Sequence, residues 1–214
     1  MIKRFIWDLD GTILDGDFSR EEELFKVNLS EEEFFKFNKQ RCYLINEYER
    51  LYSKYNRKML SDFLSIKSGV LISQDLVDKW INYMIEVNET IHSGVEDVLD
   101  YLNESGIENV IYSNWFTETQ VGRLKKVRLD SYFKEIIGSD HYMKPSREGF
   151  LHACGPYKAR DCVMVGDNYI KDIEGARKAG LNAIYYSSKE DVNVPHIKKL
   201  IKIKEMSEDE YRRY

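Results

Sequence analysis

The 214-residue chain is poor in cysteine and has no long apolar run. Its three cysteines, Cys42, Cys154 and Cys162, show no Cys-x-x-Cys spacing, which argues against a disulfide framework or a zinc site. No apolar stretch reaches the roughly 18 residues of a membrane span. Lysine and arginine at positions 3 and 4 are followed by aspartates and not by the apolar region of a signal peptide. We therefore expect a cytoplasmic protein without a membrane partner.

An excess of positive charge is also missing, because the formal net charge is −5. A protein that binds a nucleic-acid polymer needs a basic field for the phosphates, so we expect no such polymer as the main partner. Hydrophobic residues make up 43% of the chain and charged residues 32%, which suits a packed core beneath a charged surface. The length fits one domain, or one domain that carries a sizeable insertion.

Short apolar runs alternate with helical patterns along most of the chain, which predicts a parallel sheet with crossover helices. We predict strands at residues 2–8, 109–114, 136–137, 162–165 and 182–186, and an edge strand at 200–203. We predict helices at residues 95–105, 117–127, 146–154, 173–179 and 205–214.

Residues 16–88 break this alternation, because they are strongly helical and contain no convincing strand. Leu44, Tyr48, Leu51 and Tyr55 recur at the spacing of one helix face. We predict an α/β core made of residues 1–15 and 89–214, with residues 16–88 forming a helical cap beside the sheet. The aromatic residues of this cap are interpreted as its core, with a substrate pocket as the alternative.

The most informative segment is Phe5–Thr12, where an apolar run leads into Asp8 and Asp10 and then into a Gly-Thr turn. A buried parallel strand reads as a continuous apolar run, and α/β sheets place their ligands at its carboxyl end. Two carboxylates at such an end repel each other. A divalent cation and a phosphoryl group are the obvious partners that would offset this repulsion.

Other predicted strand ends also carry polar residues, namely Ser113, Lys144, Asp167 and Asp172. The carboxyl ends of parallel strands lie along one edge of the sheet, so we expect these side chains to converge with Asp8 and Asp10. Phosphoryl transfer needs a nucleophile, a cation, donors to the phosphoryl oxygens and an acid for the leaving group. Each role has an available residue at this edge.

Four ordered motifs make the chain resemble the haloacid dehalogenase superfamily, which is dominated by aspartate-nucleophile phosphatases. The motifs are Asp8-Leu9-Asp10-Gly11-Thr12, Ser113-Asn114, Lys144-Pro145 and Gly166-Asp167-Asn168-Tyr169-Ile170-Lys171-Asp172. The resemblance implies a Rossmann-like parallel sheet with helices on both faces. The helical insertion between the first two motifs is similar to that of the subgroup with an all-α cap after strand one.

By this resemblance, Asp8 is the nucleophile that forms an aspartyl-phosphate, and Asp10 is the acid and base for the leaving oxygen and the water. The resemblance also implies Mg²⁺ as cofactor, held by Asp8, the backbone carbonyl of Asp10 and Asp167. These are oxygen ligands, as Mg²⁺ prefers. Asp172 either ligates the metal through water or orients Lys144. An aspartate in the first turn of a helix is also explained by the helix dipole alone.

Ser113, Asn114 and Lys144 are assigned to phosphate binding by the same resemblance. Lys144 would in addition offset the carboxylate cluster. His92 and His141 stand outside any metal-ligand pattern and are interpreted as structural residues. Trp115 follows the phosphate motif, and we expect it to pack under the cap rather than to stack on a substrate ring.

The expected function is therefore Mg²⁺-dependent hydrolysis of a small phosphorylated metabolite. A sugar phosphate, a phosphoglycolate-like acid and a nucleoside monophosphate all remain open as substrates, and so does the oligomeric state. A phosphomutase would share all four motifs. A dehalogenase of the superfamily is disfavoured by Asp10, and a non-catalytic binding protein by the presence of every matched residue.

Overall fold

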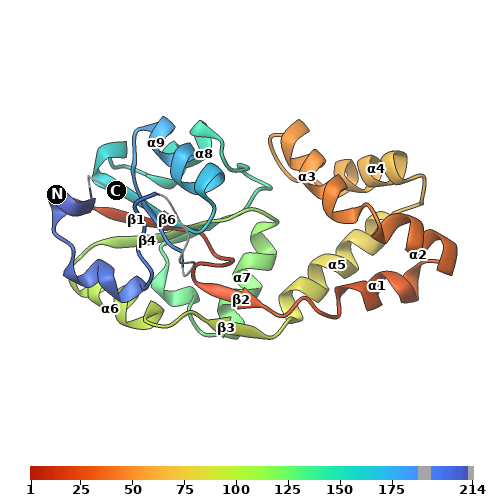
Figure 1. The fold of residues 1–214 in the computed structure, drawn as a ribbon, viewed down its shortest axis with the longest axis horizontal. Helices are drawn as coiled ribbons and strands as arrows, with labels where there is room; N and C mark the ends of the chain where they lie inside the picture. The colour runs from red at the N-terminus through yellow and green to blue at the C-terminus, as the bar shows by residue number, and fades with distance from the viewer. Residues whose placement is uncertain (188–193, 212–214) are drawn as a thin grey trace.

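The central feature of the computed structural model is a sheet of five parallel strands in the order β5-β4-β1-β6-β7 (Figure 1). The model describes residues 1–187 and 194–211. The strands are β1 (Arg4–Trp7), β4 (Glu108–Tyr112), β5 (Glu135–Ile137), β6 (Cys162–Gly166) and β7 (Asn182–Tyr185). All five were predicted from apolar runs, and the α/β fold class is confirmed.

Strand β1 lies at the centre of the sheet, and all four of its residues are buried. It pairs with β4 on one side and with β6 on the other, so that Trp7 lies beside Ile111 and Val165. Its side chains alternate, because Phe5 and Trp7 join the apolar cluster of one face while Ile6 joins that of the other. Apart from Arg4, whose guanidinium pairs with Glu108, the strand is apolar, as is typical of a strand buried on both faces, and this is why the run was recognisable in the sequence.

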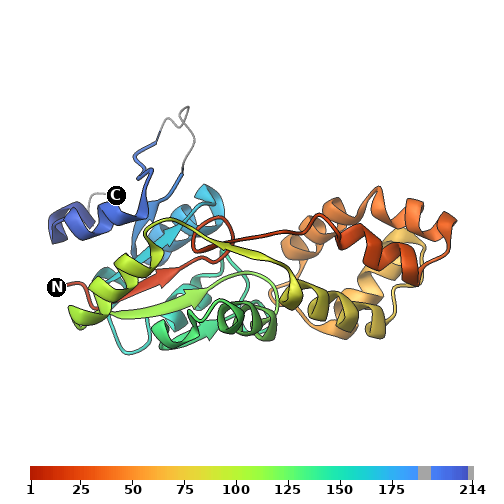
Figure 2. The same cartoon turned by 90° about the horizontal axis from the view of Figure 1, so that it is seen from below.

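Helices cover both faces of the sheet (Figures 1 and 2). On one face, α6 (Val95–Glu104) and the 3₁₀ helix η4 (Leu200–Glu205) pack against the strands, and α7 (Thr117–Lys126) contributes Leu124. On the other face lie α8 (Arg147–Ala153) and α9 (Gly175–Ala179), which follows the π-helical turn η3 (Tyr169–Glu174). Two further 3₁₀ turns are η1 (Asp130–Tyr132) and η2 (Ala159–Asp161).

Two predictions near the C-terminus were wrong in detail. Residues 200–203 do not form an edge strand, because they belong to η4, where Leu200 and Ile203 are buried in the cluster over α6. The predicted helix at residues 205–214 is reduced in the described part to α10 (Glu208–Tyr211). Residues 212–214 of that prediction lie outside the described residues.

Five helices precede β3 and form a bundle at the opposite end of the molecule from the termini (Figures 1 and 2). They are α1 (Glu21–Asn28), α2 (Glu31–Asn38), α3 (Arg41–Leu51), α4 (Arg57–Ser68) and α5 (Gln74–Glu86). They share an apolar cluster that includes Phe25, Tyr48, Leu64 and Trp80 and that extends to Trp115 and neighbouring residues outside the bundle. The helical character predicted for residues 16–88 agrees with this, and the boundary between core and cap stays an interpretation.

The predicted single helix face from Leu44 to Tyr55 was wrong at its C-terminal end. Helix α3 ends at Leu51, which is exposed, and Tyr55 lies in the loop before α4. Tyr55 is nevertheless buried in the bundle cluster. Its ring packs edge-on to Trp115 at a centroid distance of 5.0 Å, so Trp115 packs under the cap as expected.

The bundle is joined to the sheet by a short antiparallel ribbon that sequence analysis did not predict. Strand β2 (Leu14–Gly16) leaves the core and pairs with β3 (Glu89–Ile91), which returns to it. Two backbone hydrogen bonds also tie the loop before α4 to the core, from Tyr55 N to Ser139 O at 2.7 Å and from Met143 N to Ser53 O at 3.2 Å. None of the helices in the described part of the chain is both long and apolar enough to cross a membrane.

Candidate active site

The carboxyl ends of β1, β4 and β6 surround a cavity of about 190 Å³. Every site residue predicted from the sequence lines this cavity, and Asn168 and Lys171 line it as well. The lining residues are Asp8, Asp10, Ser113, Asn114, Lys144, Asp167, Asn168, Lys171 and Asp172. Positions 8 and 172 are therefore brought together by the sheet, as expected for neighbouring parallel strands.

Asp8 is placed by an extension of the sheet beyond β1, because its backbone N–H donates to Val165 O at 2.9 Å. The chain then turns sharply, and the N–H groups of Ile13 and Leu14 both donate to Leu9 O. Gly11 has a φ of +73°, a conformation that favours glycine. A Cβ at this position would lie 2.4 Å from Oδ2 of Asp167, so the turn needs glycine for space as well.

Lys144 lines the cavity and is almost completely buried. Its Nζ donates to Oδ1 of Asp8 at 2.5 Å and to Oδ1 of Asp172 at 2.6 Å. Burial acts to lower the pKa of Lys144, but attraction to Asp172 and Asp8 outweighs burial and raises it. The lysine is therefore a fixed positive charge between two carboxylates.

Asp172 is fully buried, and both of its oxygens accept hydrogen bonds from protein donors. Oδ1 accepts from Lys144, and Oδ2 accepts from the backbone N–H of Asn168 at 3.0 Å. Burial raises the pKa of Asp172 to about 7, and the ammonium of Lys144 acts in the opposite direction. This geometry favours the second of the two roles expected for Asp172, the orientation of Lys144.

Asp167 is the third carboxylate of the cluster, lines the cavity and is exposed. Ligand atoms of Asp8, Asp167 and Asp172 all lie within 4.8 Å of one another. Crowding by protein atoms, and then repulsion from Asp8, raise the pKa of Asp167 to about 6. Three carboxylates against the single ammonium of Lys144 leave two negative charges, which a divalent cation bound by oxygen ligands would offset. The residues present therefore fit Mg²⁺.

Ser113 and Asn114 follow β4 and form the side of the cavity that would contact a phosphoryl group. The Asn114 Oδ1 accepts from Ser139 Oγ and from the backbone N–H of Lys144, both at 2.9 Å. Its buried Nδ2 has no hydrogen-bond partner among the described residues. An orphaned buried donor is costly unless a ligand accepts from it, which is consistent with an anion in this cavity.

Sequence analysis assigned no role to Lys171, which lines the cavity, or to its ion-pair partner Glu49, which does not. The ammonium of Lys171, at the rim of the cavity, pairs with the Glu49 carboxylate on α3. Glu49 also accepts from the Tyr55 hydroxyl at 3.0 Å. The motif that contains Lys171 was recognised, but its partner in the cap lies 122 residues away and has no local signal.

Arg123 and Gln120 on α7 were also missed. Both are fully buried, and Arg123 donates to Oδ1 and Oδ2 of Asp10 at 2.6 and 3.0 Å. Gln120 donates to the Ser113 Oγ at 3.3 Å and to the Asn114 carbonyl at 2.6 Å. In the sequence, Gln120 and Arg123 are only two polar residues three positions apart in a predicted helix, a pattern that is also typical of a solvent-exposed helix face.

The histidines interpreted as structural lie away from this cluster. His92 contacts Tyr186 at 3.0 Å and Asp15 at 2.9 Å, and His141 is exposed beside Asp140. Neither belongs to the described residues that line the cavity. The buried Cys154 and Cys162 and the exposed Cys42 are free thiols.

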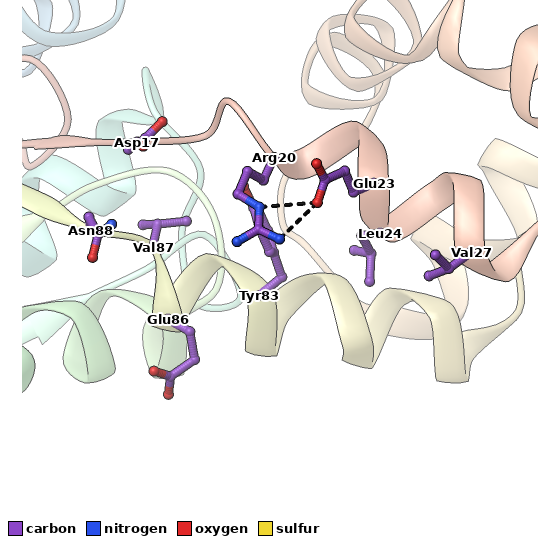
Figure 3. Close-up of a pocket in the computed structure, with 9 residues that line it drawn as sticks. All are labelled: Asp17, Arg20, Glu23, Leu24, Val27, Tyr83, Glu86, Val87 and Asn88. Carbon is purple, nitrogen blue, oxygen red and sulfur yellow. Dashed lines mark hydrogen bonds and ion pairs between the residues drawn. The ribbon is translucent and has the colours of Figure 1, made fainter.

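A larger cavity of about 470 Å³ lies where the bundle joins the ribbon (Figure 3). It is bounded by α1, α5 and the linkers, and its most prominent polar contact is the ion pair of Arg20 and Glu23. The sequence motifs do not reach this cavity. The smaller cavity at the strand ends is therefore the candidate active site.

The chain belongs to the haloacid dehalogenase-like hydrolase family, whose model matches residues 2–180. It is similar to the pyrimidine 5'-nucleotidase PynA of Streptococcus pneumoniae, with 24% identity over 204 residues that cover 86% of this chain and 84% of that protein. It is also similar to the glyceraldehyde 3-phosphate phosphatase of Methanothermobacter thermautotrophicus, with 24% identity over 88% of this chain and 87% of that one.

Among solved structures, the HAD-hydrolase YfnB of Bacillus subtilis, bound to magnesium, has the same fold. Its TM-score is 0.67, its sequence identity is 23%, and the match covers 94% of this chain and 96% of that one. The resemblance inferred from the four motifs is thereby confirmed. The names of the relatives are consistent with a phosphoric monoester hydrolase.

Proposed function

We propose that this protein is a Mg²⁺-dependent phosphatase that hydrolyses a small phosphorylated metabolite through an aspartyl-phosphate on Asp8. The observation that carries the proposal is the arrangement at the strand ends. The carboxylate of Asp8 lies in the cavity against the buried ammonium of Lys144, and Asp10 lines the same cavity two residues further along the chain.

The proposed reaction has two displacements at phosphorus. Lys144 bonds Oδ1 of Asp8, so we propose Oδ2 as the attacking oxygen, which forms a bond to phosphorus as the ester P–O bond breaks. Asp10 gives its proton to the leaving oxygen. A water then attacks phosphorus and breaks the bond to Asp8, and Asp10 takes the proton of that water. Phosphate and the free Asp8 carboxylate result.

The phosphoryl oxygens would be bound by the Ser113 hydroxyl, the Asn114 Nδ2 and Lys144. The Asn114 amide supports this role because its Nδ2 is a buried donor in need of an acceptor. The backbone N–H of Lys144 can only donate, so Oδ1 must face it, and Nδ2 cannot exchange places with the oxygen without losing this hydrogen bond.

The metal would be held by Asp8, the backbone carbonyl of Asp10 and Asp167, with Asp172 acting on Lys144. When bound, Mg²⁺ neutralises the charge between the nucleophile and the phosphate and polarises the phosphoryl group. Asp167 suits this role because repulsion from Asp8, which contributes to its raised pKa, is relieved by a cation.

The substrate class rests on the cap and on the relatives. A cavity beneath a helical cap suits a small ester better than a folded protein. The relatives named for a pyrimidine nucleotide and for glyceraldehyde 3-phosphate support small phosphate esters, without choosing between them. A cytoplasmic location stays a prediction, and so does the absence of a nucleic-acid polymer as partner. A phosphomutase remains the alternative within the same motifs.

The test is phosphate release from a panel of sugar phosphates, nucleoside monophosphates and phosphorylated acids, with Mg²⁺ or with EDTA. Wild type, Asp8→Asn and Asp97→Asn are compared, since Asp97 is an exposed aspartate in the first turn of α6. We expect turnover that needs both Mg²⁺ and Asp8 and that Asp97→Asn leaves unchanged. Isomerised sugar phosphate without free phosphate would favour the phosphomutase, and activity in Asp8→Asn would refute the nucleophile.

A further inference from the structure

An ion pair joins one wall of the active-site cavity to the helical bundle. Lys171, in the η3 turn after β6, lines the cavity, and its ammonium pairs with the carboxylate of Glu49 on α3. The side chain of Lys171 is 34% exposed, whereas that of Glu49 is only 13% exposed. Glu49 itself does not line the cavity, so Lys171 is the member of the pair that a substrate would contact.

The Glu49 carboxylate is held by two donors, one for each oxygen. Oε2 accepts from Lys171, and Oε1 accepts from the Tyr55 hydroxyl at 3.0 Å. Tyr55 is buried, and its backbone N–H donates to Ser139 O at 2.7 Å, so its position relative to the core is fixed. Burial, and then the charge of Glu49, raise the pKa of Tyr55 well above its ordinary value, which keeps the hydroxyl a donor. Glu49 is therefore a fixed negative charge beside Lys171.

Positive charge that could bind a second anionic group of a substrate is scarce around the cavity. Among the described residues that line it, Lys144 and Lys171 are the two cations. Lys144 is paired with Asp8 and Asp172, so its charge is used within the catalytic cluster. Lys171 is therefore the cation that would pair with a carboxylate or a second phosphate on the substrate, and Glu49 already occupies it.

A second anion on the substrate would have to take Lys171 away from Glu49. The largely buried Glu49 would then keep the Tyr55 hydroxyl as its remaining partner among the described contacts, which is costly for a carboxylate that has lost most of its water. An anion that left the pair intact would meet a neutral pair and gain no net attraction. The cavity of about 190 Å³ is small beside the Debye length of about 10 Å in about 0.1 M salt, so salt screens these charges little.

We propose that Glu49 is a specificity-determining residue, which neutralises Lys171 so that the site selects phosphate esters of uncharged alcohols and rejects esters that carry a second anionic group. The substrate class is then a phosphate ester of a neutral polyol, sugar or nucleoside, and not a phosphorylated acid or a bisphosphate. The inference rests on the proposed function, because it concerns the ester that the phosphatase hydrolyses.

The test compares two esters of the same length that differ in one charge. Glycerol 3-phosphate and 3-phosphoglycerate share the phosphorylated primary alcohol, but the first has a hydroxymethyl group where the second has a carboxylate. The readout is the ratio of kcat/KM for glycerol 3-phosphate to kcat/KM for 3-phosphoglycerate at saturating Mg²⁺. For an ester that is bound but not hydrolysed, its inhibition constant against p-nitrophenyl phosphate is compared instead.

The main variant is Glu49→Gln, which removes the charge but keeps an acceptor for the Tyr55 hydroxyl. The matched control is Glu47→Gln. Glu47 lies on the same helix, is also 13% exposed and pairs with Lys67 of α4 inside the bundle. Thermal unfolding shows whether each variant is folded.

We expect the wild type to favour glycerol 3-phosphate. Glu49→Gln should reduce the ratio about fivefold by raising kcat/KM for 3-phosphoglycerate, because a partly exposed ion pair contributes up to about that factor. Glu47→Gln should leave the ratio unchanged. The double variant Glu49→Gln with Lys171→Met should return the ratio to the wild-type value, since the ammonium that Glu49→Gln releases is then absent.

A wild type that prefers 3-phosphoglycerate would overturn the inference, because Lys171 would then bind the acid group of the substrate. A folded Glu49→Gln variant with an unchanged ratio would overturn it too, and would leave the ion pair as a structural contact between bundle and core. A double variant that keeps the lowered ratio would overturn the part given to Lys171.

The wild type and Asp8→Asn are measured first with all three esters, so that the proposed function is tested separately. If the wild type is inactive with Mg²⁺, or if Asp8→Asn remains active, the proposed function fails and the role of Glu49 fails with it. If activity requires Asp8 and Mg²⁺ but the ratio does not depend on Glu49, only the specificity inference fails.

Discussion

Replacement of Lys144 by methionine should destabilise the metal-free protein strongly at neutral pH. The ammonium bonds Asp8 at 2.5 Å and Asp172 at 2.6 Å, and Asp167 lies in the same cluster. Methionine keeps most of the side-chain volume but removes the charge. Buried carboxylates would then remain close together without a cation.

The magnitude follows from the burial of the three groups. The side chains of Lys144, Asp8 and Asp172 are 3%, 10% and 0% exposed, so solvent screens their interaction little. Removing one partner from a buried ion pair costs about 3–5 kcal/mol. We expect a loss of this size in the free energy of unfolding at pH 8 in EDTA.

The loss should shrink as the pH falls. The folded-state pKa values of Asp167 and Asp172 are already raised to about 6 and about 7 from an ordinary value of 3.8, and loss of Lys144 raises them further. A raised folded-state pKa means that the group favours the folded state at low pH and disfavours it as the pH rises through the folded pKa. At pH 5 the carboxyls of the variant take up protons and the repulsion disappears.

The assay is urea denaturation at pH 8 and pH 5 in EDTA, with Lys158→Met as an exposed control that should change stability by less than about 0.5 kcal/mol. The double variant Lys144→Met with Asp172→Asn should regain part of the stability at pH 8. A loss that is equal at both pH values, or that Asp172→Asn does not relieve, would refute this account of the cluster.

Three further predictions concern the metal, the turn and the bundle. Because Mg²⁺ needs ionised ligands and the pKa of Asp167 is raised to about 6, Mg²⁺ affinity measured by calorimetry should fall about fivefold between pH 6 and pH 5, and constant affinity would contradict this. Gly11→Ala places a Cβ 2.4 Å from Asp167 and should weaken Mg²⁺ binding. The control Gly106→Ala, at a similar φ of +71° but in open space, should cost about 1–2 kcal/mol of stability and leave Mg²⁺ binding unchanged. Equal effects of the two changes on Mg²⁺ binding would be inconsistent with the turn geometry. Trp80→Ala empties the centre of the bundle beside Trp115 and should cost about 3–5 kcal/mol in urea denaturation, and a loss below about 1 kcal/mol would count against that packing.

The strands and the catalytic cluster were predictable because each has a local signal. A strand buried on both faces is typically an apolar run, as in β6 and, after Arg4, in β1. The polar residues that follow such runs meet at one edge of the sheet, whichever helices lie between them. Asp8 and Asp167 could therefore be assigned to one site although they lie 159 residues apart in the sequence.

The remaining features depend on contacts that leave no local pattern. In Leu200–Glu205, apolar residues fit an alternating strand and a 3₁₀ turn equally well, and packing of Leu200 and Ile203 over α6 decides the outcome. Arg123 stands beside Lys125 and Lys126 in a helix that reads as basic and exposed. Its partners lie 113 and 34 residues away, so only the folded chain shows that it is buried.

The ribbon of β2 and β3 was missed for the same reason. Each strand has three residues, too few for a recognisable alternation, and their pairing requires the bundle to return the chain to its starting point. The helices of the bundle were predictable as helices, but their contacts with the core were not. One such contact is the ion pair of Glu49 with Lys171.

The central claim, that Asp8 is phosphorylated during turnover, is tested most directly by trapping the intermediate. The enzyme is mixed with its preferred ester and Mg²⁺, quenched in acid within the first turnover, and digested for mass spectrometry of the peptide that contains Asp8. The account predicts a hydroxylamine-labile phosphoryl group on Asp8 that is absent in EDTA and in Asp8→Asn. Turnover without a phosphorylated peptide, or a label on another residue, would contradict it.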